Sequence, residues 1–147
     1  TDAAENLPLE VVSTGLPYLI VPVSKGLEKA CICTRQFESL LAEIGAKFVY
    51  VLDVFTKEGR TWGNDGKIED IATGSAAGPA AAYLVKYGLA RAGEVVLIRQ
   101  GRFVHRPSEL FACVRKDSDF MVTVKGQVCF VGSGSIELPD HLIQRKA

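Results

Sequence analysis

The chain has 147 residues, of which 48% are hydrophobic and 23% charged, as expected for one globular domain long enough to bury a core. Lysine plus arginine and aspartate plus glutamate number 17 each, so the formal net charge is zero. This balance argues against nucleic acid and anionic membranes as partners. No apolar run approaches the roughly 20 residues of a membrane-spanning helix. We expect one cytoplasmic domain over 1–147, with a loosely ordered start at 1–8 and a tail at 139–147.

The first third of the chain predicts two strands followed by two helices. Residues 9–13 and 18–23 are apolar and β-branched, and Gly15 and Pro17 mark a turn between them. A short helix is expected at 25–30, and a second one at about 34–44 with Thr34 as its N-cap. Its apolar face repeats at i, i+3, i+4 and i+7, through Phe37, Leu40, Leu41 and Ile44. Gly45 suits the position after its end.

A buried strand and a polar stretch follow. Residues 48–55 are aromatic and β-branched, which predicts a strand. Residues 56–67 contain three glycines and predict a long loop or an irregular hairpin. Trp62 stands alone in this stretch, and we interpret it as a cover over the core rather than as a ligand contact.

An alanine-rich helix is predicted at about 75–87, ending at Gly88. Its early residues are almost all small, so other backbones can approach it closely, which indicates burial inside a curved sheet. Pro79 is expected near the first turn, where its missing N–H costs little.

The remainder is mainly β. Strands are predicted at 95–100, 110–114, 120–124, 128–131 and 135–138, with turns at Asp117-Ser118 and Lys125-Gly126. The fold class is therefore α+β. We expect a strongly curved, mainly antiparallel sheet wrapped around the helix at 75–87, with the helix at 34–44 outside.

The four cysteines do not have the spacing of a zinc site. Cys31 and Cys33 form C-x-C, and Cys113 and Cys129 are isolated. We therefore expect no metal and interpret the cysteines as reduced, small apolar side chains. A redox role for Cys31 and Cys33 is the alternative.

Residues 68–79, Ile-Glu-Asp-Ile-Ala-Thr-Gly-Ser-Ala-Ala-Gly-Pro, are the most informative stretch. They place two carboxylates, two hydroxyls and glycine at the start of the alanine-rich helix. The first turn of a helix has unpaired N–H groups and the positive end of the helix dipole, so it binds anions. The stretch predicts a site for a small carboxylate-bearing ligand, with Asp70 or Glu69 as acid or base.

This motif resembles the signature of the phenazine-biosynthesis PhzF-like family, within the diaminopimelate-epimerase superfamily. Three further segments resemble family motifs in the same order. They are Val-Ser-Thr-Gly-Leu-Pro at 12–17, Gln-Gly-Arg at 100–102 with Arg-Pro-Ser at 106–108, and Val-Gly-Ser-Gly at 131–134. The similarity runs from Leu9 to about Leu138.

The resemblance implies one half of a two-lobe active site. Family members have two similar lobes, each a curved sheet around a helix, and the ligand lies between the two helix N-termini. This chain resembles the second, C-terminal lobe, and the catalytic glutamate of the first lobe has no counterpart here. The resemblance assigns Asp70 and Ser75 to catalysis, and Thr73, Gly74 and Ser75 to anion binding. Racemase relatives have a cysteine near the position of Ile71, so thiol chemistry is not expected, and no cofactor is implied.

Each candidate residue also has a structural alternative. Asp70 could cap the helix or pair with Arg60 or Arg106, and Ser75 could be the N-cap. Gln100 and Gly101 are placed at the border of the cleft, although a tight turn explains Gly101 equally well. Arg106 could clamp a carboxylate or form a salt bridge at the Pro107 turn.

Three hypotheses for function follow. The first is a PhzF-like isomerase or epimerase-related protein that binds a small anionic metabolite for cofactor-independent proton transfer. Its second lobe would come from a separately encoded partner or from a homodimer. The second is a non-catalytic anion-binding or homodimeric interaction module, and the third is a domain of a longer enzyme. The sequence does not specify the substrate.

Overall fold

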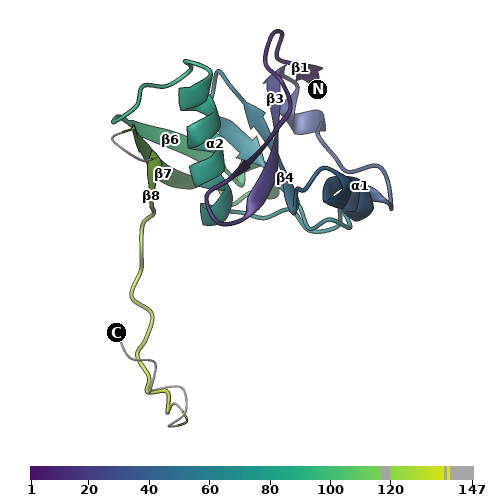
Figure 1. Ribbon diagram of the computed structural model, residues 1–147. Coiled ribbons are helices and arrows are strands. Elements are labelled where there is room, and N and C mark those ends of the chain that lie inside the picture. Colours follow the sequence, from purple (N-terminus) through teal and green to yellow (C-terminus); the bar gives the residue numbers. More distant parts are fainter. Residues whose placement is uncertain (117–119, 138, 140–147) are drawn as a thin grey trace.

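The computed structural model describes residues 1–116, 120–137 and 139. It shows a curled eight-stranded sheet and two α-helices (Figure 1). The helices are α1, Phe37–Glu43, and α2, Gly74–Lys86, and short 3₁₀ turns lie at Leu27–Lys29 and Arg102–Val104. The strands are β1 Asp2–Ala3, β2 Glu10–Ser13, β3 Pro17–Lys25, β4 Phe48–Asp53, β5 Glu58–Arg60, β6 Val95–Gln100, β7 Ser108–Lys116 and β8 Phe120–Lys125.

The sheet is mixed but mainly antiparallel. Its order is β1-β3-β4-β5-β6-β7-β8, and β2 also pairs with β3. The β3–β4 and β5–β6 pairs are parallel, and the other pairs are antiparallel. β1 pairs with the end of β3 and β2 with its beginning, so both lie along the edge of β3 opposite β4.

Helix α2 lies inside the curl and contacts β2, β3, β4, β6, β7 and β8. Side chains alternate between the two faces of each strand. Tyr18 and Ile20 of β3 therefore face α2 together with Tyr50 and Leu52 of β4. Ala76, Ala77, Ala80 and Ala81 of α2 are fully buried. The small residues of α2 let it pack inside a curved sheet, as its composition predicted.

A second, smaller cluster lies on the opposite face of β3 and β4. It contains Val49, Val51, Leu41 of α1 and Trp62. Trp62 is 7% exposed, which agrees with its interpretation as a cover over the core. Helix α1 starts later than predicted, because Thr34 Oγ1 accepts a hydrogen bond from the Gln36 N–H in the turn before it.

Helix α2 ends close to the predicted residue, but its proline lies further into the helix than predicted. Gly88 has a left-handed φ of 72°, and the Leu89 N–H donates to the Leu84 carbonyl over 2.8 Å, which is a Schellman ending. Pro79, however, is the sixth residue of α2 and not part of its first turn. Its missing N–H leaves the Ser75 carbonyl without the usual helical donor.

Several strand predictions need correction. The stretch 56–67 contains β5, which pairs antiparallel with β4, so the hairpin alternative is the one observed. β1 was not predicted. The strands predicted at 128–131 and 135–138 are wrong over 128–131 and 135–137, where the described chain pairs with no neighbour. β-propensity needs a partner strand, and in Figure 1 the chain leaves the body after β8.

Other predictions fall outside the described residues. These are the turn at Asp117-Ser118, Leu138 of the last predicted strand, and the predicted tail apart from Pro139. No helix in the described residues is both long and apolar enough to cross a membrane.

Candidate functional site

The N-terminus of α2 opens to solvent with two unpaired amides. Ala76 and Ala77 donate their N–H groups to the Thr73 carbonyl over 3.1 and 3.2 Å. Within the described residues, the Gly74 and Ser75 N–H groups have no hydrogen-bond partner, and both residues are exposed. Two free donors at the positive end of a thirteen-residue helix can bind an anion.

Asp70 lies just before this helix and is exposed. Its Oδ2 accepts a hydrogen bond from Thr73 Oγ1 over 2.7 Å, and its Oδ1 accepts one from the Ala72 N–H over 3.4 Å. The Asp70 N–H donates to the Thr61 carbonyl over 3.0 Å. No ion pair to Asp70 occurs within residues 1–116, 120–137 and 139. The carboxylate is therefore held in place locally, but the capping alternative is wrong, because the N-cap residue of α2 is Thr73 and no described side chain caps the helix.

Gln100, at the end of β6, positions Asp70 and Thr73. Its Nε2 donates to Thr73 Oγ1 and to the Asp70 carbonyl, each over 2.8 Å. Its Oε1 accepts from the Thr73 N–H over 3.3 Å and from the Tyr50 hydroxyl over 3.1 Å. Gln100 is 1% exposed, so all four hydrogen-bonding positions of a buried amide are used inside the protein. Ligand contact by Gln100 remains a prediction.

The Tyr50 hydroxyl donates a hydrogen bond to Gln100 Oε1 and helps to hold that side chain in place. The sequence did not indicate this role. Tyr50 is fully buried, and burial raises the pKa of its phenol far above the usual range, so it stays a donor. Its ring lies against Gly59 of β5, where a Cβ would overlap the ring. The aromatic pattern of residues 48–55 predicted a buried strand. Only the pairing of β4 with β5, and of β5 with β6, brings Tyr50 to Gln100.

Tyr18 is a second residue that sequence reasoning missed. Its hydroxyl lies 2.8 Å from Ser75 Oγ, and it is 3% exposed. Burial raises the pKa of Tyr18 more than its hydrogen bond with Ser75 lowers it. The phenol is thus protonated at neutral pH and can orient the Ser75 hydroxyl. The alternation of β3, which puts Tyr18 on the same face as Ile20, was the available signal.

Gly101 and Arg106 belong to the turn that follows Gln100. Gly101 has a φ of 84°, and a Cβ there would lie 2.5 Å from the Ile71 carbonyl oxygen. Gly101 therefore lets two backbone segments meet behind the site. Arg106 donates its backbone N–H to the Gly101 carbonyl over 2.9 Å. Its side chain is exposed and has no carboxylate partner in the described residues, so the predicted salt bridge at Pro107 is not formed.

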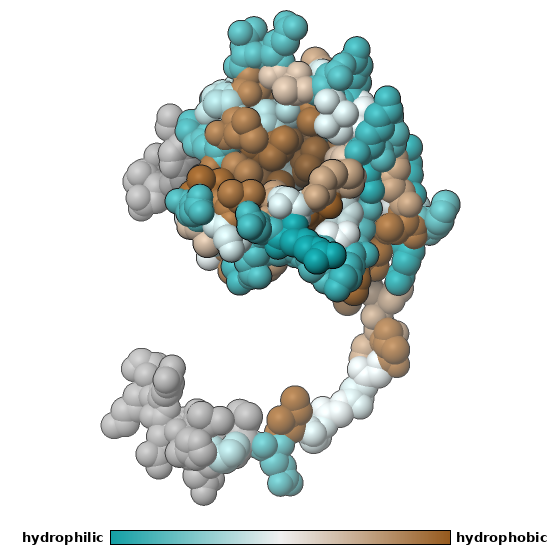
Figure 2. All heavy atoms as spheres, turned by 90° about the vertical axis from the view of Figure 1, so that its right-hand side faces the viewer, coloured by the Kyte–Doolittle hydropathy of each residue, from teal (hydrophilic) through white to brown (hydrophobic). Residues whose placement is uncertain are grey.

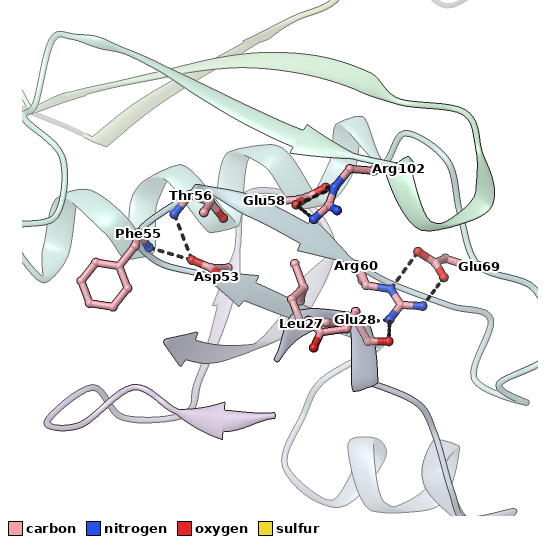
Figure 3. Close-up of polar contacts among 9 residues, drawn as sticks. All are labelled: Leu27, Glu28, Asp53, Phe55, Thr56, Glu58, Arg60, Glu69 and Arg102. Atoms are coloured by element: carbon pink, nitrogen blue, oxygen red, sulfur yellow. Dashed lines mark hydrogen bonds and ion pairs between the residues drawn. The ribbon is translucent and has the colours of Figure 1, made fainter. Parts of the chain in front are cut away.

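Arg60 fixes the strand segment that leads to the site (Figure 3). Its Nε and Nη2 donate to Glu69 over 3.0 and 2.6 Å, and its Nη1 donates to the Leu27, Glu28 and Ala30 carbonyls. The guanidinium lies between Trp62 and Phe103, 4.7 and 4.6 Å from their ring centres. Glu69 is therefore a structural partner of Arg60, and its neighbour Asp70 is the carboxylate left for a ligand.

A groove of about 670 Å³ reaches the site at Ala72 and continues past Arg99, Ser108 and Gln127. The described residues hold no group of three or more His, Cys, Asp or Glu side chains that could bind a metal ion. The amides and hydroxyls at the site can bind an anion, and the Asp70 carboxylate can transfer a proton.

Comparison with known proteins decides the family. The sequence model described as phenazine biosynthesis-like protein matches residues 1–134. The chain belongs to this family. The motifs around the α2 N-terminus are therefore those of a PhzF-like protein, as the sequence resemblance indicated.

Solved structures share the fold. A structure titled as a predicted epimerase from Pseudomonas aeruginosa is 47% identical with a TM-score of 0.74, over 88% of this chain and 47% of that one. A PhzF-family phenazine biosynthesis protein from Bacillus anthracis is 27% identical with a TM-score of 0.69, over 84% and 46%. Both agree with a mixed α+β fold built on a curled sheet.

Curated relatives carry an isomerase name. The trans-2,3-dihydro-3-hydroxyanthranilate isomerases of Pseudomonas chlororaphis and Pseudomonas fluorescens are each 38% identical over 95 residues. That match covers 59% of this chain and 34% of either isomerase. The matched parts thus correspond to about half the length of the solved relatives and about a third of the length of the curated ones.

Proposed function

We propose that this chain forms one half of the active site of a cofactor-independent PhzF-like isomerase. In this proposal the N-terminus of α2 binds the carboxylate of a small metabolite, and Asp70 moves a proton on the neighbouring carbon. The substrate class is a small unsaturated or hydroxylated carboxylic acid, of the kind named for the curated relatives. The chain would be the second of two lobes.

The arrangement of Asp70 beside unpaired helix donors supports the proposal most. The Gly74 and Ser75 N–H groups and the Ser75 hydroxyl point to one end of α2. Asp70 is held next to them through Thr73 and Gln100. A ligand carboxylate bound by the amides would place its α or β carbon near the Asp70 carboxylate. General acid–base catalysis needs such reach, about 2.6–3.2 Å between heavy atoms.

A single lobe supplies one acid or base, and isomerisation needs a proton donated as well as removed. The same carboxylate can return the proton on one face of the substrate, whereas a two-base mechanism needs a group from an opposing lobe. Ile71 stands where racemase relatives have a cysteine, so this lobe offers no thiol for that role. We therefore place the complete site between this lobe and a second one, supplied by a partner or by a second copy.

Two measurements test the proposal. Titration of the ¹⁵N-labelled chain with trans-2,3-dihydro-3-hydroxyanthranilate and with other small carboxylic acids should shift the Gly74 and Ser75 amide signals. Incubation of the same acids in deuterated water should place deuterium at carbon, and Asp70→Asn should abolish this exchange. Asp65→Asn is the matched control, because Asp65 is an exposed carboxylate whose partner among the described residues is the nearby Lys67.

The outcomes separate the hypotheses. Amide shifts with Asp70-dependent exchange support an isomerase half-site. Amide shifts with no exchange, even with a first lobe of the family added, favour the non-catalytic anion-binding module. Absence of both amide shifts and exchange overturns the proposal.

A further inference from the structure

Cys31 and Cys33 face each other on the surface, far in sequence from the site described above. Their Sγ atoms lie 3.2 Å apart, and both side chains are exposed. Residues 30–34 have no regular secondary structure. The two sulfurs thus meet within one short irregular segment.

The segment that carries the pair is held in place on both sides of Cys31. The preceding Ala30 carbonyl accepts a hydrogen bond from Arg60 Nη1 over 3.1 Å. Ile32, between the two cysteines, packs on the second hydrophobic cluster. Since backbone and intervening side chain are both fixed, the two thiols meet without ordering a flexible loop. Closing the gap to an S–S bond of about 2.05 Å requires the sulfurs to approach by about 1.2 Å.

The pair borders an apolar groove of about 580 Å³ between α1 and the outer face of the sheet. Figure 2 shows an apolar hollow on this face of the molecule. The groove is lined by Leu19, Val51, Phe37 and Trp62 as well as by Cys31 and Cys33. A change at the sulfurs therefore alters one wall of the groove, next to the only tryptophan of the chain.

We propose that Cys31 and Cys33 are a redox-active dithiol that closes to an intramolecular disulfide by exchange with a small-molecule disulfide such as oxidised glutathione. One cysteine thiolate attacks the oxidant, forms a mixed disulfide and releases one glutathione thiol. The second cysteine, as its thiolate, attacks the cysteine sulfur of the mixed disulfide, forms the Cys31–Cys33 bond and releases the second glutathione thiol. The protein loses two electrons and two protons, and one glutathione disulfide becomes two glutathione molecules.

The two thiols of the pair ionise one after the other. The hydrogen bond with Cys31 and the charge of Cys31 raise the pKa of the Cys33 thiol. The second proton of the pair is therefore lost at higher pH than the first, and exchange needs only one thiolate at a time. This inference does not depend on the proposed isomerase function.

The chain offers a clean assay. Trypsin cuts after Lys29 and Arg35, so residues 30–35 form a peptide containing both cysteines and no other. After treatment with oxidised glutathione, unfolding and alkylation, the thiol count should fall from four to two per chain. The peptide should be two hydrogen atoms lighter and unalkylated. Trp62 fluorescence should change in the native chain and recover with dithiothreitol.

Variants define the outcome. Cys33→Ser should stop at a glutathione adduct on Cys31, without the fluorescence change of closure. A variant with Cys113→Ser and Cys129→Ser should still close, which shows that the remaining cysteines are not needed. Four alkylated thiols in the wild type, a persistent glutathione adduct on peptide 30–35, or that peptide linked between two chains would overturn the proposal.

Discussion

Replacing Glu69 by Gln removes the charge opposite Arg60 and keeps the shape of the side chain. The Arg60 and Glu69 side chains are 10% and 6% exposed, and Nη2 lies 2.6 Å from Oε2. Glutamine can accept only one of the two hydrogen bonds that Arg60 donates to Glu69. The NH₂ group of the glutamine then faces the other N–H donor of Arg60, and two donors cannot form a hydrogen bond. The guanidinium remains buried without its counter-charge.

The expected cost follows from this burial. Removing one partner of a buried ion pair destabilises a protein by about 3–5 kcal/mol, and the retained hydrogen bond favours the lower end, about 3 kcal/mol. For a chain of this size that is about 6–12 °C in melting temperature. Arg60→Met should cost more, because the Leu27, Glu28 and Ala30 carbonyls also lose their donor.

Urea denaturation followed by Trp62 fluorescence measures the free energy of unfolding. Glu94→Gln is the matched control, because Glu94 pairs with Arg91 over 3.5 Å at 62% and 85% exposure. Such an exposed pair contributes less than about 0.5 kcal/mol. If Glu69→Gln and Glu94→Gln change the unfolding free energy equally, the claim that Arg60 organises the approach to the site is wrong.

Three further predictions concern other parts of the chain. Gly101→Ala should lower the unfolding free energy by about 2–4 kcal/mol, because it combines a left-handed φ with overlap on the Ile71 carbonyl. Gly45→Ala, with a φ of 74° and open space around it, should cost only about 1 kcal/mol. Lys86 holds the pKa of Glu10 below its usual value of 4.5. The stabilisation by Glu10 should thus be complete at neutral pH and be lost as pH falls through the lowered pKa, so denaturation curves of wild type and Glu10→Gln should differ at neutral pH and converge at acid pH, once Glu10 is protonated in the folded chain. Sedimentation at tens of micromolar should show a dimer, since exposed apolar side chains follow β8, and a monomer would contradict this prediction.

Local patterns predicted most of the regular structure. Apolar, β-branched and aromatic runs marked β3, β4, β6 and β7, and the small residues of α2 indicated its burial inside a curved sheet. The hydrophobic repeat located α1, although the helix begins at Phe37 and not at the predicted residue 34, because the turn at Thr34 precedes it. The strand predicted at 128–131 failed because a strand requires a neighbour, and propensity alone does not supply one.

In the candidate site, too, local sequence predicted some features, and contacts between residues far apart in the chain could not be predicted. Free amides at the start of α2 follow from the sequence order of Thr73, Gly74 and Ser75. Their surroundings do not, because Tyr18 reaches Ser75 across 57 positions of the chain and Gln100 reaches Thr73 across 27. Such contacts depend on strand order and register, which local propensity leaves open.

The sequence by itself determined the family, the position of the helix whose N-terminus can bind an anion, and the two carboxylates before it. The tertiary structure decided which carboxylate is available to a ligand. Glu69 faces the buried guanidinium of Arg60, and Asp70, one residue later, points to the opposite side and meets Thr73 at the start of α2. Successive residues of an extended chain face opposite ways, so the register of the Trp62–Glu69 bridge assigns Glu69 to the protein interior and Asp70 to the site.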